Sequence, residues 1–153
     1  MVYYDTTSRN GDPASYRYIT KGEARTYPGV NFSVHSTLLK NLTPDKTYYF
    51  IVGDESAGYS NERKFRTVPE TGVIRFISGG DASVSETFEE VCKIAAESNP
   101  HFAIIGGDIA YADGKIKSQQ LWLELLDIWQ RTMVTEEGYT IPVIAAIGNH
   151  EVA

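Results

Sequence analysis

The chain has 153 residues, of which 42% are hydrophobic and 22% charged, a balance typical of a folded globular protein. Its formal net charge of −6 argues against binding nucleic acid, because that needs a surface of clustered Lys and Arg. No stretch approaches the roughly 18 consecutive apolar residues of a membrane span, and no basic and apolar signal segment follows Met1. We therefore expect a small-molecule substrate, no nucleic acid, no membrane span and no signal peptide in this chain.

Residues 1–68 carry short segments that are separated by turn residues, a pattern typical of an all-β sandwich. The turns contain pairs such as Asn10-Gly11 and Pro28-Gly29. The segments predicted as strands are Val2 to Tyr4, Ser15 to Thr20, Glu23 to Tyr27, Asn31 to Leu39, Thr47 to Gly53 and Glu62 to Thr67. His35, within the fourth segment, is predicted as an ordinary strand residue. The first domain is therefore predicted to be a β module.

The segment Leu42 to Val52 resembles a corner of fibronectin type III domains, in which a tyrosine hydroxyl bonds to the backbone of the preceding turn. A sandwich of that type has about 100 residues, so residues 1–68 predict an incomplete fibronectin III-like sandwich that lacks its first strands. An incomplete sandwich has an exposed sheet edge, and exposed edges favour association.

Val68 to Gly72 has the composition of a linker, and after it the pattern changes to alternating strands and helices. In residues 69–153 we predict strands at Val73 to Ile77, Phe102 to Ile105 and Ile141 to Ile147. This β-α-β-α-β order predicts a second domain that is one half of a parallel α/β sheet.

Two helices are predicted between these strands. Ser83, with Glu86 three residues on, has the spacing of a capping box for the first helix. The apolar face of that helix is predicted at Phe88, Val91, Ile94 and Ala95, and that of the second at Leu121, Leu125, Ile128 and Trp129. Trp122 is also expected in the core. Cys92, the only cysteine, is predicted to be a small buried side chain and excludes a cysteine-based zinc site.

Each strand of the second domain is followed by glycine and polar side chains. The segments are Ser78-Gly79-Gly80-Asp81, Gly106-Gly107-Asp108-Ile109-Ala110-Tyr111 and Gly148-Asn149-His150-Glu151. Ligands of open α/β sheets bind beyond the carboxyl ends of the strands, so we expect these side chains on one rim. Oxygen donors from Asp, Tyr and Asn suit hard cations, and a phenolate suits ferric iron. The pattern predicts a dinuclear metal site.

Gly-Asp, Gly-Asp-x-x-Tyr and Gly-Asn-His-Glu, in this order after a fibronectin-like module, resemble the first three motif blocks of purple acid phosphatases. Tyr111 narrows the resemblance from the wider calcineurin-like metallophosphoesterase superfamily to the purple subset. The resemblance covers nearly the whole chain. It implies the first half of an α/β metallophosphoesterase sandwich, an acid phosphatase that hydrolyses phosphate monoesters of small substrates, and an extracellular or secretory location.

The resemblance also implies a role for each motif residue. Asp81 would bind a ferric ion, Asp108 would bridge it to a second metal, and Tyr111 would complete the ferric side as a phenolate. Asn149 would bind the second, divalent metal, which in this family is iron, zinc or manganese. His150 would face the phosphate without binding metal, stabilising charge or helping to protonate the leaving group. Two such metals, roughly 3.5 to 4 Å apart, clamp phosphate oxygens and activate a bound water.

Two features depart from the family pattern. The first block commonly reads Gly-Asp-x-Gly, whereas here Asp81 is followed by Ala82 and Ser83, which puts the backbone around that ligand in doubt. The sequence also contains no Val-x-x-His or Gly-His-x-His block, which supply three histidine ligands. His101 begins the strand that leads to Asp108, about 23 Å away, and cannot replace them.

We therefore expect weak or absent metal binding and no useful turnover from this chain. Half of an α/β sandwich would also leave apolar sheet and helix surface uncovered. Exposed apolar patches of this kind favour association, so we expect a poorly soluble or self-associating protein.

Each motif has an ordinary structural explanation when it is taken singly. Asp81 could cap a helix, Asp108 and Tyr111 could form a turn, and His150 could be a solvated residue near a chain end. Asp113 is predicted to be a turn residue with Gly114 and not a ligand. The occurrence of all three motifs at successive strand ends favours the metal site.

Two other functions remain open. One is another calcineurin-like phosphoesterase that acts on diesters, nucleotides or phosphoproteins, against which Tyr111 argues. The other is a non-catalytic binding module in residues 1–68 that recognises glycans or cell-surface material.

Overall fold

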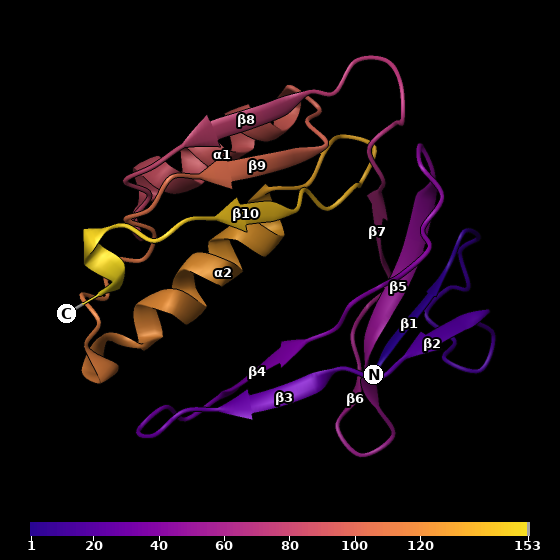
Figure 1. The fold of residues 1–153 in the computed structure, drawn as a ribbon, viewed down its shortest axis with the longest axis horizontal. Helices are drawn as coiled ribbons and strands as arrows, with labels where there is room; N and C mark the ends of the chain where they lie inside the picture. Colours follow the sequence, from indigo (N-terminus) through magenta and orange to yellow (C-terminus); the bar gives the residue numbers. More distant parts are fainter. Residues whose placement is uncertain (153) are drawn as a thin grey trace. The chain divides into compact units, whose positions relative to one another are not determined.

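The computed structural model describes residues 1–152 and divides into two compact units, Met1–Gly72 and Val73–Ala153. The division falls at the end of the segment that the sequence predicts as a linker. Each unit has its own sheet, as Figure 1 shows.

The strands of the first unit pair in antiparallel fashion. In its main sheet, β1 (Val2–Asp5) pairs with β2 (Tyr18–Thr20) and β5 (Thr47–Asp54), and β5 also pairs with β6 (Gly58–Tyr59) and β7 (Arg63–Arg66). The separate hairpin of β3 (Glu23–Thr26) and β4 (Ser33–Ser36) has every residue exposed, His35 included. The first unit is therefore all-β, as predicted, although β2 and β4 are shorter than predicted and β6 begins in a predicted turn.

Aromatic side chains fill the interior of the first unit. Tyr4 on β1 and Tyr48 on β5 are both buried. The ring of Tyr4 stacks on Tyr18 at a centroid distance of 5.1 Å, and that of Tyr48 stacks on Phe65 at 5.7 Å. The hydroxyl of Tyr48 accepts a hydrogen bond from Thr43 N at 3.0 Å, which is the bond that the corner motif predicts. The tyrosine-rich run thus closes the corner and supplies the core.

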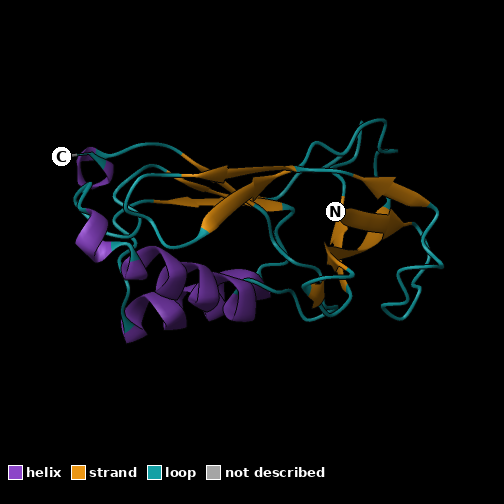
Figure 2. Cartoon of the chain, turned by 90° about the horizontal axis from the view of Figure 1, so that it is seen from below, coloured by secondary structure: helices purple, strands orange, loops and turns teal. Residues whose placement is uncertain are grey.

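The second unit is a three-stranded parallel sheet in the order β10-β9-β8, with helices between the strands. β8 (Phe76–Gly79), α1 (Glu86–Glu97) and β9 (Phe102–Ile105) are followed by the short 3-10 helix η1 (Ile116–Ser118), α2 (Gln120–Thr132), β10 (Val143–Ala145) and the 3-10 helix η2 (Asn149–Glu151). Both α-helices lie on one face of the sheet (Figure 2). No helix within residues 1–152 has the length and apolar character needed to cross a membrane.

The start of the second unit differs from the prediction. β8 begins at Phe76, because that residue pairs with Phe102 at the start of β9, whereas Val73 lies outside the strand and is 81% exposed. The N-cap of α1 is Ser85, whose hydroxyl accepts a hydrogen bond from the third residue of the helix at 3.1 Å. Ser83, the predicted cap, instead belongs to the loop at the end of β8.

The face that α1 buries is only partly the predicted one, since Phe88 packs against the core as predicted. Val91 and Ile94 are 55% and 65% exposed, whereas Cys92 and Ala96 are buried. Phe88, Cys92 and Ala96 are spaced by four residues and form the stripe that meets the sheet. The larger side chains of Val91 and Ile94 lie beside this stripe, so their hydrophobicity did not identify the residues that the helix buries. The prediction that Cys92 is buried is confirmed.

The face that α2 buries is the predicted one. Leu125, Ile128 and Trp129 are buried, and Trp122 packs partly buried against the core. The indole of Trp129 donates to the Ile141 carbonyl at 3.0 Å, which satisfies the polar group of a buried ring.

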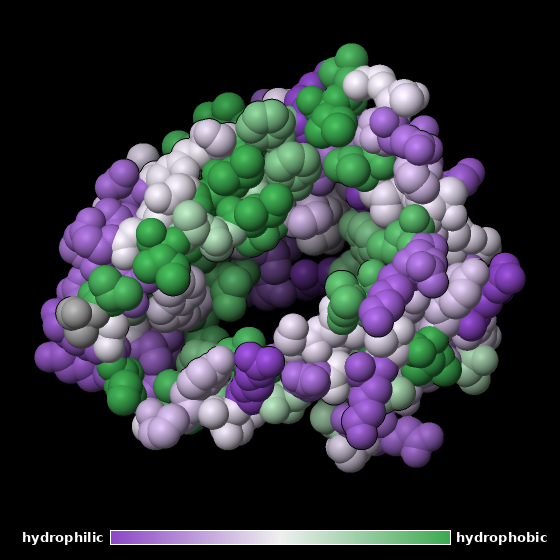
Figure 3. All heavy atoms as spheres, in the orientation of Figure 1, coloured by the Kyte–Doolittle hydropathy of each residue, from purple (hydrophilic) through white to green (hydrophobic). Residues whose placement is uncertain are grey.

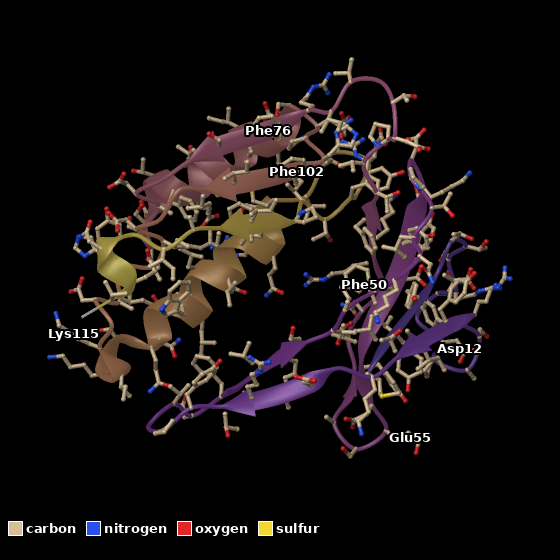
Figure 4. The ribbon with its side chains drawn as sticks, viewed as in Figure 1. Asp12, Phe50, Glu55, Phe76, Phe102 and Lys115 are labelled. Atoms are coloured by element: carbon tan, nitrogen blue, oxygen red, sulfur yellow. The ribbon has the colours of Figure 1, made fainter. Side chains whose placement is uncertain are left out.

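The sheet face opposite the helices is mostly apolar, with Ser78 as a polar exception, and it is partly exposed. Phe76, Phe102, Ile104 and Ile144 alternate with the residues that meet the helices, and Phe76 and Ile144 are 53% and 56% exposed. The rings of Phe76 and Phe102 stack at a centroid distance of 5.5 Å (Figure 4). Figure 3 shows hydrophobic side chains gathered over β8, β9 and β10. We call these four residues the open face.

Candidate metal centre

The loops that follow the three parallel strands are joined by hydrogen bonds at one end of the sheet. The N–H groups of residues 81–83 donate to the carbonyls of residues 107–109 at 2.8 to 3.3 Å. On the other side, His150 N donates to Asp108 Oδ1 at 2.9 Å. The three segments that carry the predicted site residues therefore meet in one rim, which we call the rim loops: residues 79–83, 107–113 and 148–151.

The phenol of Tyr111 and the carboxylate of Asp81 are in direct contact. Tyr111 Oη donates to Asp81 Oδ1 at 2.9 Å. This hydrogen bond raises the pKa of Tyr111, and burial and the charge of Asp81 raise it further. Neighbouring oxygen ligands of an octahedral cation with metal–oxygen distances of about 2.1 Å are about 3 Å apart. The two oxygens are thus spaced as a pair of ligands to one cation would be.

Asp108 lies where two loops come closest together. A Cβ atom at Gly148 would lie 2.2 Å from Asp108 Oδ1 and 2.5 Å from Asp108 N. A Cβ atom at Gly107, where φ is 104°, would lie 2.6 Å from Gly148 N. Side chains cannot occupy such distances, so glycine at both positions allows the loops to approach.

Glu151 holds these two loops together, a role that the sequence did not predict. Its carboxylate accepts hydrogen bonds from the N–H groups of Asp108, Ile109 and Gly148, each at 2.7 Å. Burial raises the pKa of Glu151, but the three hydrogen bonds outweigh burial and lower it. Its place in the Gly-Asn-His-Glu block was the only sequence signal that could have drawn attention to it.

Asp113, predicted as a turn residue, also contacts a predicted site residue. Its Oδ1 lies 2.5 Å from His150 Nδ1, and Lys115 Nζ donates to its Oδ2 at 2.9 Å. The hydrogen bond to Asp113 raises the pKa of His150, and the same bond lowers the pKa of Asp113. A carboxylate only accepts, so Nδ1 carries the proton and Nε2 is left for other contacts. The imidazole also lies 4.3 Å from the ring of Tyr111, centroid to centroid.

The backbone of the rim loops is unusually rich in left-handed residues. Among the non-glycine residues with positive φ are Asp81, Ser83, Asp108, Tyr111 and Asp113, with φ between 51° and 59°. A left-handed tyrosine is uncommon, and strain of this kind concentrates at functional sites. Ser83 stands where the family pattern has its second glycine, and it adopts a conformation that glycine would adopt more easily.

The remaining predicted residues and histidines lie as follows. Asn149 is exposed at the start of η2. His101 precedes β9, at the end of that strand opposite Asp108, where its Nδ1 lies 3.2 Å from Arg75 N. Within residues 1–152, no three His, Cys, Asp or Glu side chains are grouped so that they could hold a metal. The candidate donors are therefore two carboxylates, one phenol and one amide.

A comparison with protein families finds a match in the first unit. Residues 1–67 match the family model described as Purple acid Phosphatase, N-terminal domain. No curated protein matches the chain. The match lies within the all-β first unit and ends before the parallel sheet. The first unit is therefore similar to the N-terminal domain of purple acid phosphatases, which supports that family for this chain.

Proposed function

We propose that the rim loops hold a dinuclear metal centre of the purple acid phosphatase type and that its reaction is the hydrolysis of phosphate monoesters. The observation that carries the proposal is the 2.9 Å contact between Tyr111 Oη and Asp81 Oδ1, because a phenol beside a carboxylate is the donor pair that distinguishes the purple subset. The family match over residues 1–67 supports the same assignment from a separate part of the chain.

Each donor has a proposed partner. Asp81 and Tyr111 would hold a ferric ion, Asn149 would hold a divalent iron, zinc or manganese ion, and Asp108 would bridge the two. When bound, the metals would supply charge for the phosphate oxygens and a water of lowered pKa. Each of these groups, whether carboxylate, phenol or amide, offers an oxygen atom, and oxygen donors suit hard cations.

The remaining chemistry belongs to His150. Asp113 holds its Nδ1, so the imidazole is fixed in one orientation with Nε2 available to the substrate. We propose that in the imidazolium form, in which both ring nitrogens carry a proton, Nε2 donates a hydrogen bond to the phosphate or a proton to the leaving group. A protein of this type would act on small phosphorylated substrates outside the cell or in the secretory pathway.

The test of the proposal is a visible absorption band when Fe³⁺ is added. A tyrosinate bound to ferric iron absorbs visible light, so the chain should give a weak band that Tyr111→Phe abolishes. Tyr139→Phe, which removes a hydroxyl outside the rim loops, should leave the band unchanged. A band that persists in Tyr111→Phe would contradict the proposal and favour another calcineurin-like phosphoesterase or a binding module.

We expect no useful turnover from the 153-residue sequence, because it contains no Val-x-x-His or Gly-His-x-His block. Metal analysis and hydrolysis of p-nitrophenyl phosphate would test this expectation. Turnover at the rate of complete purple acid phosphatases would contradict it.

We also propose that a second copy of the chain covers the open face. The four residues of the open face are all apolar, and exposed apolar surface favours association. Light scattering should show concentration-dependent association that Ile144→Lys reduces. Leu126→Lys on α2 is the matched control, since Leu126 is 52% exposed and Ile144 56%. Equal association of the two variants would contradict the proposal.

A further inference from the structure

We infer that Glu151 is a positioning residue that fixes the place of Asp108 in the rim loops. The inference rests on the proposed function in one respect, since it is Asp108 that would bridge the metals. The hydrogen bonds of Glu151 define its role independently of any metal.

Both oxygens of Glu151 are engaged by backbone groups of two different loops. Oε2 accepts from Asp108 N and Gly148 N, and Oε1 accepts from Ile109 N, each at 2.7 Å. A carboxylate that accepts three short hydrogen bonds has little capacity left for a cation. Glu151 therefore lies beside the proposed metal ligands without being one of them.

The bonds run in both directions between the loops. Glu151 takes the N–H of Asp108, while the carboxylate of Asp108 takes the N–H of His150 at 2.9 Å. Each loop thus supplies an acceptor for the backbone of the other. Glu151 therefore holds the backbone of Asp108, and the bond from His150 N restrains the carboxylate that would bind metal.

The close approach of the loops depends on this arrangement. Asp108 is left-handed, with φ of 53°, and its Oδ1 lies 2.2 Å from the position that a Cβ at Gly148 would take. Without Glu151, three part-buried N–H groups would lose their acceptor and would need water in its place. Water in that place would not tie the two loops together, so Asp108 would be held less firmly.

The experiment compares Glu151→Gln and Glu151→Ala with the unaltered chain, with Glu136→Gln at an exposed position as the control. Amide hydrogen exchange of Asp108, Ile109 and Gly148 is measured first, with no metal added. We expect exchange at these three amides to become at least about tenfold faster in Glu151→Ala. Glu151→Gln keeps one acceptor oxygen and should show a smaller change. Unchanged exchange in both variants would overturn the inference.

The second measurement is the affinity of the rim loops for Mn²⁺, which is determined from NMR line broadening. Loss of a residue that orients a ligand weakens metal binding by about 10- to 100-fold. We therefore expect at least about tenfold weaker binding in Glu151→Ala. Unfolding followed by tryptophan fluorescence would show that the second unit of this variant still folds. Unchanged affinity together with faster exchange would overturn the positioning role. If Glu151→Ala does not fold, Glu151→Gln decides both measurements. Absence of Mn²⁺ binding by the unaltered chain agrees with its missing histidine blocks, and the amide exchange alone then supports or overturns the inference.

Discussion

Carboxylates in the first unit and in the rim loops have different surroundings. Asp5 is 3% exposed and accepts hydrogen bonds from the side chain of Arg9 and the N–H groups of Thr7 and Arg17. Asp81 is exposed and accepts a hydrogen bond from the hydroxyl of Tyr111, whose proton a cation could displace. The carboxylate of Asp5 is therefore occupied by hydrogen bonds within the fold, whereas that of Asp81 is available to a ligand.

Glu62 and Glu151 extend the comparison. Glu62 accepts from Ser8 Oγ, Tyr16 Oη and two backbone N–H groups, and it ties the loop after β1 to the start of β7. Glu151 does the same between two loops of the second unit. Glu62 and Glu151 differ from Asp81 in the number of hydrogen bonds that they accept. We infer that this number, and not position in a motif, separates carboxylates that join loops from those that can bind a ligand.

Removing a carboxylate that accepts several hydrogen bonds should have the largest effect on the free energy of unfolding. Asp5→Ala leaves Arg9 and two N–H groups without their acceptor, and we expect a loss of about 3 kcal/mol in the free energy of unfolding of the first unit. Tyrosine fluorescence and far-UV circular dichroism would measure it. Tryptophan fluorescence should not change, because Trp122 and Trp129 both lie in the second unit. Asp12→Ala, at an exposed position, is the control, and an equal loss there would break the comparison.

Adding a side chain between the rim loops should have the next largest effect on stability. Gly148→Ala places a Cβ 2.2 Å from Asp108 Oδ1, so the loops must separate, and we expect a loss of about 2 kcal/mol in the second unit. Gly79→Ala is the matched control, since a Cβ there meets nothing within 4 Å. Denaturant unfolding followed by tryptophan fluorescence would compare the two. Equal stability of both variants would show that the loops do not approach as described.

Acidification should destabilise the first unit through its saturated carboxylates. Burial raises the pKa values of Asp5 and Glu62, but their hydrogen bonds outweigh burial and lower both below the ordinary values of 3.8 and 4.5. The unfolded chain then binds more protons than the folded one, so their stabilisation is complete above those values and is lost as pH falls through the lowered pKa values. Unfolding by urea between pH 6 and pH 3 would measure it. Asp5→Asn with Glu62→Gln should flatten the slope, and an unchanged slope would contradict this account.

A small gain should come from relieving strain near Asp81. Ser83 has φ of 59°, which glycine adopts without steric cost, so we expect Ser83→Gly to stabilise the second unit by about 0.5 to 1 kcal/mol. Ser85→Gly is the control, because it removes the side chain that caps α1 and should not stabilise. A destabilised Ser83→Gly would mean that the serine side chain matters more than its backbone strain.

Much of this fold could be predicted from the sequence. The buried face of α2 and the order of elements in the second unit follow from local spacing, and the hydrogen bond of the tyrosine corner follows from the resemblance to fibronectin type III domains. The buried face of α1 could not, because Cys92 and Ala96 meet the sheet while the more hydrophobic Val91 and Ile94 remain exposed. Local hydrophobicity does not reveal which helix face a sheet will cover.

The site shows the same limit. Glycines after three strands predicted that the loops could meet, and the loops do meet. The bonds of Glu151 to Asp108 and Ile109 and the contact between Asp113 and His150 link residues 37 to 43 positions apart, so local spacing carried no sign of them. The metal roles of Asp81, Asp108, Tyr111 and Asn149 stay predictions.

The most direct test of the account is a titration of the ¹⁵N-labelled chain with Mn²⁺. Paramagnetic broadening detects weak binding, so it can find a cation that an incomplete ligand set holds loosely. The account predicts that amide signals of all three rim loops broaden together, that signals around Asp5 and Glu62 do not, and that Asp81→Asn with Asp108→Asn abolishes the effect. Broadening of a single rim loop, or broadening around Asp5 and Glu62 instead, would contradict a shared metal centre.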